Sequence, residues 1–261
     1  MEWWSNAFEI QYSSTPIRID VAGVKVMTRS EHEWESKEYA QEWVSKDEQR
    51  ALDREAQFNA ALKWLSVFLE GPSQVLDLGS GPGTLAGKIL SAFPEINVIC
   101  LDGSDEMLRQ ARQRLAPFGH RVSFIESDFG AADWSSGLPR ELSAVVSARA
   151  VHNLRKLKPI ERVYQQIYEL LRPGGLFMNI ERVNFSTPNL RRYYRDLQIK
   201  TRGHAAKMDG PAPNLMQQFQ LLKRAGFKDV DCFWREGNTA VIGGFKNRLK
   251  RQSRNQREEE I

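Results

Sequence analysis

A glycine-rich turn in the stretch VLDLGSGPGTLA, residues 75–86, has the residue types and spacing of a ligand-binding loop. A run of apolar residues typical of a buried strand precedes the turn, and a helix-like pattern follows it. Turns of this kind bring backbone N–H groups close to a bound nucleotide. The sequence therefore predicts a nucleotide-like ligand here, and the neighbouring residues restrict which one.

The composition of the turn disfavours a phosphate-containing ligand. A dinucleotide fingerprint would need a glycine where Thr84 stands, and Pro82 has no N–H group to donate. A P-loop is excluded because no Gly-Lys-Ser/Thr follows. No lysine or arginine occurs between residues 75 and 87. A pyrophosphate would therefore find little compensating charge at this turn.

Acidic residues stand at or near the ends of three successive strand-like runs, at Asp77, Asp102 and Asp128. They favour a ligand that carries hydroxyl groups and positive charge over one that carries phosphates. S-adenosylmethionine has two ribose hydroxyls, an ammonium and a sulfonium, and it has no phosphate. Asp102 could accept hydrogen bonds from the two vicinal hydroxyls of a ribose. NAD also has such hydroxyls, so Asp102 alone does not distinguish the two ligands. Two structural alternatives remain open: Asp102 as a helix N-cap, and Asp128 as the cap of the next turn.

Strand-like and helix-like runs alternate from residue 73 onward, which indicates a mostly parallel sheet with helices on both faces. The strand-like runs are SQVLDLG, INVICLD, RVSFIES, LSAVVSAR and GLFMNIE, followed by KDVDCFW and TAVIGGFK. The last two runs flank a turn at residues 235–238 and predict an antiparallel hairpin at the sheet edge. Residues 171–175 predict a helix stop followed by a turn. Ligands of such sheets bind beyond the carboxyl ends of the strands.

At this point the sequence resembles the class I S-adenosylmethionine-dependent methyltransferases of the small-molecule type, over roughly residues 45–246. The matching motifs, in order, are VLDLGSGPG, CLDGSDEMLRQAR, FIESDF, LRPGGLF and the final hairpin. The resemblance implies an α/β fold with a Rossmann-like, seven-stranded, mostly parallel sheet. It also implies S-adenosylmethionine as cofactor, S-adenosylhomocysteine as product, and methyl transfer to a small-molecule acceptor by direct in-line displacement.

The resemblance also assigns cofactor contacts along the chain. Asp77 would orient the glycine loop, Asp102 would hold the ribose, Asp128 would accept the adenine amino group, and the N–H of Phe129 would meet a ring nitrogen. The remaining cofactor residues would be Gly79, Ser80, Gly81 and Gly83 around the methionine part, Gly103 and Met107 beside the ribose, and Ser147 and Ala148 at the methyl-donor end.

The stretch SARAVHNL, residues 147–154, contains the candidate catalytic residue His152. A neutral imidazole here would take a proton from the acceptor, or it would bond a backbone carbonyl and shape the pocket. Many relatives have two histidines where this chain has His152 and Asn153, which weakens the analogy. Tyr194 and His204 are further acid–base candidates. No His, Cys or carboxylate cluster has metal-ligand spacing, so no metal is expected.

The predicted organisation has three parts. Residues 1–45 form an N-terminal extension of short strands and a helix, suited to capping the pocket or contacting a second copy in a homodimer. Residues 46–246 form the methyltransferase domain, with a basic, lid-like insertion at about 182–212. The basic residues of this insertion fit the solvated face of a helix better than an anion site. Residues 247–261 form a polar tail, first basic and then acidic.

Composition and charge restrict the partners. The net charge is +4, and the segment from Lys246 onward holds six basic and three acidic residues, so the rest of the chain is nearly neutral. Nucleic acid is therefore not the expected partner, although an RNA methyltransferase remains the alternative, as does a non-catalytic cofactor-binding scaffold. No membrane span or signal peptide is expected. The two cysteines lack the number and spacing of a disulfide framework or a zinc site, which is consistent with a reducing cytoplasm.

Overall fold

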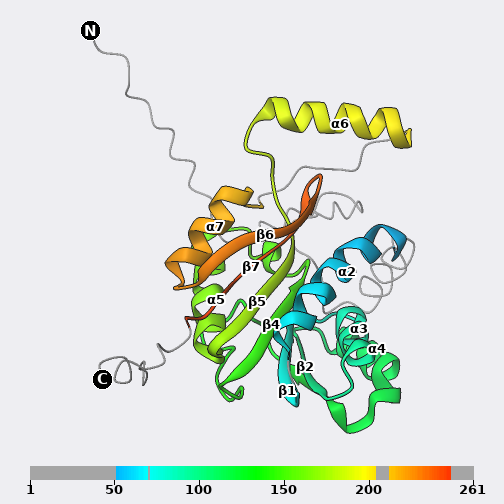
Figure 1. The fold of residues 1–261 in the computed structure, drawn as a ribbon, viewed down its shortest axis with the longest axis vertical. Coiled ribbons are helices and arrows are strands. Elements are labelled where there is room, and N and C mark those ends of the chain that lie inside the picture. The colour runs from blue at the N-terminus through cyan, green and yellow to red at the C-terminus, as the bar shows by residue number, and fades with distance from the viewer. Residues whose placement is uncertain (1–50, 70, 204–211, 248–261) are drawn as a thin grey trace, which may run out of the picture. The chain divides into compact units, whose positions relative to one another are not determined.

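The computed structural model describes residues 51–69, 71–203 and 212–247. Its centre is a sheet whose strands follow the order β3-β2-β1-β4-β5-β7-β6 (Figure 1). The strands are β1 Ser73–Leu78, β2 Ile96–Asp102, β3 Val122–Glu126, β4 Leu142–Ala148, β5 Leu171–Arg182, β6 Lys228–Glu236 and β7 Thr239–Phe245. The strands β1 to β5 pair in parallel, and β7 pairs antiparallel with both β5 and β6. The predicted seven-stranded sheet with an antiparallel hairpin is therefore confirmed.

Helices cover both faces of this sheet (Figure 1). They are α2 Ala51–Phe68, α3 Thr84–Ala92, α4 Asp105–Leu115, α5 Leu157–Leu170, α6 Pro188–Arg202 and α7 Leu215–Arg224, with short 3-10 turns η1 Ala116–Arg121 and η2 Val151–Leu154. Side chains of a strand alternate between its two faces. Leu76 and Leu78 of β1 therefore pack with α5 and α7, whereas Val75 packs with α2, α3 and α4.

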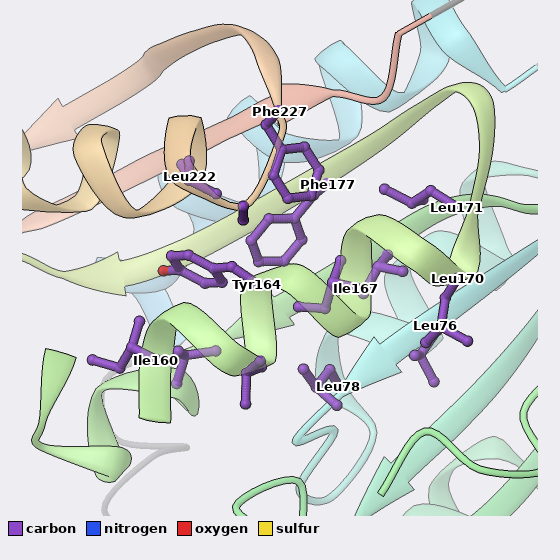
Figure 2. Close-up of a cluster of buried hydrophobic side chains, with 14 of the residues drawn as sticks. Leu76, Leu78, Ile160, Tyr164, Ile167, Leu170, Leu171, Phe177, Leu222 and Phe227 are labelled. Carbon is purple, nitrogen blue, oxygen red and sulfur yellow. The ribbon is translucent and has the colours of Figure 1, made fainter. Parts of the chain in front are cut away.

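The cluster under α5 contains the three largest fully buried side chains of the described residues (Figure 2). They are Tyr164, Phe177 and Phe227, and the ring of Phe177 packs against both of the others. Ile160, Tyr164 and Ile167 of α5 recur at helical spacing, so one face of the helix is buried against the sheet. On the opposite face, Phe58 and Leu65 of α2 are buried as their spacing predicts. Burial of these two sets fixes the sheet between its helix layers.

The segment Leu171–Gly175 corrects a sequence prediction. A turn was expected between helix and strand, but β5 begins at Leu171, directly after α5 ends at Leu170. Leu142 pairs with Leu171 and Ala144 pairs with Leu176, so β5 has an irregular register over this stretch. Gly174 has a left-handed φ of 78°. The turn-forming residues therefore make a bulge inside the strand, because the flanking residues still find pairing partners on β4.

The predicted insertion at 182–212 contains the helix α6, which the Thr187 side chain caps through the N–H of Leu190. Arg191, Arg192 and Arg195 are exposed on it, as predicted for a solvated helix face. Residues 204–211 lie outside the described residues. So do the predicted extension at 1–45 and nearly all of the predicted tail at 247–261. The described residues all belong to one compact unit, Glu33–Ile261, of the two into which the chain divides.

Candidate active site

The glycine turn lies at the carboxyl edge of the sheet and is bonded to the end of the neighbouring strand. The N–H groups of Gly79 and Ser80 both donate to the carbonyl of Leu101, at 2.8 and 3.0 Å. The N–H of Gly81 donates to Oδ2 of Asp102 at 2.8 Å. Parallel pairing of β1 with β2 therefore brings the turn and Asp102 together, although 21 residues separate Gly81 from Asp102.

The glycines of the turn have different surroundings. A Cβ atom on Gly79 would lie 2.3 Å from Cβ of Ala150, and one on Gly83 would lie 2.8 Å from Cδ1 of Leu115. A Cβ on Gly81 would meet no atom of the described residues within 4 Å. All three have left-handed φ values, which are 67° for Gly79, 53° for Gly81 and 75° for Gly83. Gly79 and Gly83 thus allow close packing inside the protein, whereas Gly81 borders open space where a ligand can approach the backbone.

We expect Gly79→Ala to lower the free energy of unfolding by about 2–4 kcal/mol, because it combines overpacking with a strained left-handed residue. Gly81→Ala has the same backbone strain without the clash, so about 1–2 kcal/mol is expected. Urea unfolding of both variants measures the difference. Equal costs for the two variants would contradict the packing role of Gly79.

Asp77 is buried beneath the turn. Its Oδ2 accepts the N–H of Ala86 at the start of α3, at 3.1 Å. Its Oδ1 is buried and has no hydrogen-bond partner among the described residues. Burial, reinforced by the charge of Asp102, raises the pKa of Asp77 to about 7. An unpartnered buried carboxylate oxygen beside a second acid fits a ligand that brings N–H donors and positive charge, as S-adenosylmethionine does.

The raised pKa of Asp77 predicts a pH dependence. Because the folded-state value lies above the ordinary 3.8, the folded protein retains a proton that the unfolded chain has already released. The free energy of unfolding of the unliganded protein should therefore fall as the pH rises from about 4 to about 7. A positively charged ligand binds more favourably when the Asp77 carboxyl has lost its proton. S-adenosylmethionine should therefore stabilise the protein more at about pH 8 than at about pH 6.

Melting curves across this pH range, with and without the ligand, measure both effects. Asp77→Asn is the matched control, because it keeps the side-chain volume and removes the titrating proton. The variant should lose the pH-dependent part of the ligand response. An unchanged pH dependence in Asp77→Asn would assign the effect to another group.

Asp102 ends β2 and has two backbone bonds. Its Oδ1 accepts the N–H of Ser104 at 3.0 Å, in addition to the bond from Gly81 to Oδ2. Burial raises its pKa. Ser104, not Asp102, is the N-cap of α4, since its side chain accepts the N–H of Met107. Asp102 therefore does not cap the helix, and its carboxylate can still accept hydrogen bonds from hydroxyl groups. Of the two neighbouring candidates, Met107 is buried and Gly103 is exposed.

Asp128 follows β3 and has an exposed side chain. Its Oδ1 accepts the N–H of Gly130 at 2.7 Å, which is the turn-capping role that the sequence left open. The carbonyl of Gly130 accepts a bond from the Arg162 guanidinium of α5, so this loop is fixed from both sides. Phe129 is half-buried, and its ring lies near Gly79. The cap uses only one of the two Asp128 carboxylate oxygens, Oδ1.

The two residues predicted to line the methyl-donor end differ in their positions. Ser147 is completely buried, and its hydroxyl donates to the Leu78 carbonyl at 2.8 Å. Its side chain therefore links β4 to β1 instead of facing a ligand, because a hydroxyl in this interior requires a partner. Ala148, one residue later at the end of β4, keeps accessible surface.

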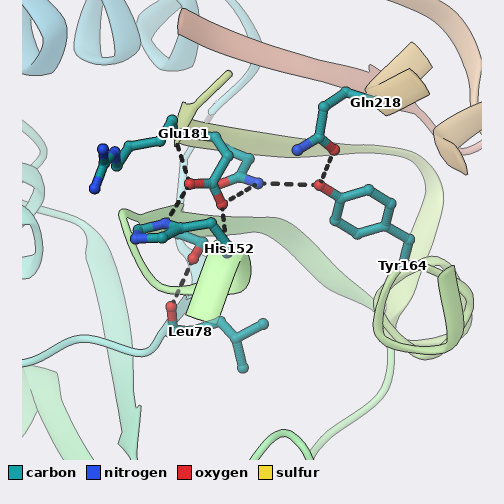
Figure 3. A network of polar contacts seen from close by, with 8 residues as sticks. Leu78, His152, Tyr164, Glu181 and Gln218 are labelled. Atoms are coloured by element: carbon teal, nitrogen blue, oxygen red, sulfur yellow. Dashed lines mark hydrogen bonds and ion pairs between the residues drawn. The ribbon is translucent and has the colours of Figure 1, made fainter. Parts of the chain in front are cut away.

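His152 lies in η2, beyond the end of β4, and contacts a carboxylate that sequence reasoning missed (Figure 3). Its Nδ1 is 2.5 Å from Oε1 of Glu181, and its backbone N–H donates to Oε2 at 3.0 Å. The Glu181 side chain is completely buried, whereas that of His152 is 17% exposed. The sequence feature that could have indicated Glu181 is its position as an acid at the end of the fifth strand-like run. Its pairing with His152 depends on the β4–β5 contact.

The other acid–base candidates are not joined to this pair in the described structure. The Tyr194 ring of α6 packs against Phe185, with centroids 5.2 Å apart, and its hydroxyl lies against Gly237 in the β6–β7 turn. His204 falls outside the described residues. Within the described ranges, no group of three or more His, Cys, Asp or Glu is arranged to hold a metal ion. No helix in those ranges is long and apolar enough to span a membrane.

Comparison with known proteins identifies this arrangement. A family described as "Methyltransferase domain" matches residues 75–175, from β1 to the start of β5. Carboxy-S-adenosyl-L-methionine synthase of Nautilia profundicola is 26% identical over 72% of this chain and 83% of its own length. Trans-aconitate 2-methyltransferase of Methylobacterium radiotolerans is 37% identical over 42% of this chain and 38% of its own.

Solved structures agree on the fold. Human N-acetylserotonin methyltransferase, solved with S-adenosylmethionine, aligns with 82% of this chain and 57% of its own, at a TM-score of 0.59 and 23% identity. The methyltransferase SibL aligns at a TM-score of 0.52 and 22% identity, over 67% of this chain and 51% of its own. The chain thus spans about half the length of these structures. With the glycine turn, the acids at the strand ends and the strand order in agreement, residues 75–175 contain a methyltransferase domain, and the described part of the chain has the fold of the S-adenosylmethionine-dependent methyltransferases.

Proposed function

We propose that this protein transfers the methyl group of S-adenosylmethionine to a small-molecule acceptor by direct in-line displacement, with His152 as general base. The observation that carries the proposal is the contact between His152 Nδ1 and the buried Glu181 carboxylate, 2.5 Å apart, at the sheet edge that bears the cofactor motifs. Bound S-adenosylmethionine supplies an electrophilic methyl group on a sulfonium. The protein's residues must bind it, align the acceptor and remove a proton where the acceptor has one to lose.

The cofactor would be held along the edge formed by β1, β2 and β3. We assign the ribose to Asp102, since its oxygens retain acceptor capacity beside their backbone bonds. The unpartnered Oδ1 of Asp77 and the hydroxyl of Ser80 would serve the methionine part, which passes over Gly81. Asp128 and the N–H of Phe129 would bind adenine. The absence of lysine and arginine from the glycine turn supports this over a phosphate ligand.

The Glu181 carboxylate prepares His152 for proton transfer. A carboxylate only accepts hydrogen bonds, so Nδ1 of His152 must carry the proton that joins them. The neutral ring then has Nε2 as its acceptor atom, ready to take a proton from an acceptor hydroxyl, amine or carbon acid. When the ring becomes an imidazolium, the buried charge of Glu181 stabilises it.

A small-molecule acceptor is supported by the relatives and by the charge distribution. The printed names of the similar proteins refer to trans-aconitate, quinones and S-adenosylmethionine itself. The basic residues of α6 are solvated, and most of the net positive charge belongs to the segment from Lys246 onward. An RNA acceptor and a non-catalytic scaffold remain the alternatives. A cytoplasmic location and a homodimer stay predictions from the sequence.

The test is methyl transfer from labelled S-adenosylmethionine to a panel of small carboxylates, phenols, amines and quinols, with bulk RNA as a separate arm. Transfer to a small molecule that depends on His152 supports the proposal. RNA methylation, with RNA affinity that falls steeply as salt rises, would favour the RNA alternative. Tight cofactor binding without transfer to any acceptor would favour the scaffold.

A further inference from the structure

A line of buried polar side chains leads from Glu181 away from the cofactor edge and into the core (Figure 3). Nδ2 of Asn179 lies 3.4 Å from Oε2 of Glu181 and 3.2 Å from the Tyr164 hydroxyl. That hydroxyl donates to Oε1 of Gln218 at 2.7 Å. These residues come from β5, α5 and α7, so three separate elements meet behind His152.

All four of these side chains are completely buried, in a region otherwise filled by apolar residues. Polar groups at such positions require partners, and apolar side chains of similar size would pack there with less constraint. Oδ1 of Asn179 and Nε2 of Gln218 have no hydrogen-bond partner in the described part of the chain. The chain therefore maintains a polar network where packing alone would not need one, which points to a role at the end that reaches the site.

The directions of the hydrogen bonds follow from the charge of Glu181. Burial, together with that charge, raises the pKa of Tyr164, so its hydroxyl stays protonated and donates to Gln218. The Tyr164 oxygen then accepts from Asn179. The amide of Asn179 must face the carboxylate with its N–H, because its oxygen would be repelled there. A single assignment of donors and acceptors therefore satisfies every hydrogen bond of the line from Gln218 to Glu181.

The Glu181 carboxylate is also fixed from its other side. Oε1 accepts the N–H of Arg182 at 2.6 Å, and Oε2 accepts the N–H of His152. Rotation of the carboxylate would break the bonds to both backbone groups and to Asn179. Oε1 is consequently held at the position where Nδ1 of His152 meets it.

We propose that Asn179, Tyr164 and Gln218 are positioning residues, which act through Glu181 to keep His152 in the tautomer with the proton on Nδ1. This inference rests on the proposed role of His152 as base, because only that role requires a free Nε2. None of the three would touch the cofactor or the acceptor. Their effect is on the population of the reactive tautomer, so they deepen the proposed function instead of replacing it.

The test is ¹⁵N NMR of the histidine rings in the full-length protein at mildly alkaline pH. The chain has four histidines, and His152→Ala assigns the signals of His152 by their disappearance. In the unmodified protein we expect one Nδ1–H tautomer and a downfield Nδ1 proton. Tyr164→Phe should abolish the downfield proton and move the two ring nitrogen shifts towards each other, as tautomers mix. Gln218→Met, one bond further away, should cause a smaller shift in the same direction.

Tyr168→Phe is the matched control. It lies one turn further along α5, and its ring packs against Phe227 and Lys246. It should leave the His152 signals unchanged. Each variant must also retain a cooperative melt and the response to S-adenosylhomocysteine, which separates positioning from unfolding. If Tyr164→Phe folds and the His152 signals are unchanged, the inference is wrong. If Tyr164→Phe does not fold, the His152 signals of Gln218→Met provide the test instead. The measurement needs no acceptor, so its outcome is independent of whether methyl transfer requires His152.

Discussion

Asp102→Ala should remove most of the thermal stabilisation that S-adenosylhomocysteine gives to this protein. A ligand that binds only the folded state, at about 100 times its Kd, stabilises it by roughly 2.7 kcal/mol. For a domain of this size, that corresponds to a rise of about 5–10 °C in Tm. Asp102 would accept the ribose hydroxyls and already accepts the N–H of Gly81, so its loss removes a ligand contact and the attachment of the turn.

The measured quantity is the increase in Tm on adding the ligand, which separates binding from the stability of the variant itself. Asp105→Ala is the matched control, since Asp105 is an exposed acid in the first turn of α4 that pairs with Arg112. It should keep the full increase. NAD should cause no increase in any form of the protein. A full response in Asp102→Ala, or a response to NAD, would contradict the assigned cofactor position.

His152→Ala should lower kcat/KM for a proton-losing acceptor by about 10²–10⁴-fold, the usual contribution of a general base. Glu181→Gln should cause a loss of similar order, because it removes the charge that stabilises the imidazolium. The double variant should be little worse than either single one, since residues that act as a unit are not additive. The measurement is steady-state kinetics with an acceptor identified from the panel.

Cofactor binding provides the internal control for these variants. Both should retain the Tm increase with S-adenosylhomocysteine, because neither residue is assigned to the cofactor. His120→Ala, at an exposed histidine, should leave kcat/KM unchanged. Unchanged kinetics in His152→Ala would assign the histidine to pocket shape, which is the other interpretation that the sequence allows.

Much of the cofactor edge could be predicted because it depends on local sequence. The alternation of strands and helices, the hairpin and the glycine turn follow from periodicity and turn residues that act over a few positions. Asp77 and Asp102 are candidate ligand-binding residues from the sequence alone, because acids at the ends of buried strands have no packing role. The buried bond from Ser147 to the Leu78 carbonyl could not be predicted, since it depends on which strand lies beside β4.

The fold class, the ligand type at the turn and the acids near it follow from the sequence, because these are properties of short segments. The partners of His152 follow from the packing of elements that are distant in the chain. Glu181 is 29 residues from it and Gln218 lies on the last helix, so only the packing of β4, β5, α5 and α7 brings them together. Packing also distinguishes Gly81 from Gly79 and Gly83. All three glycines have a left-handed backbone, but a Cβ atom would clash with neighbouring side chains only at Gly79 and Gly83. Strand order and burial are long-range properties, and they decide which of the candidate residues share a site.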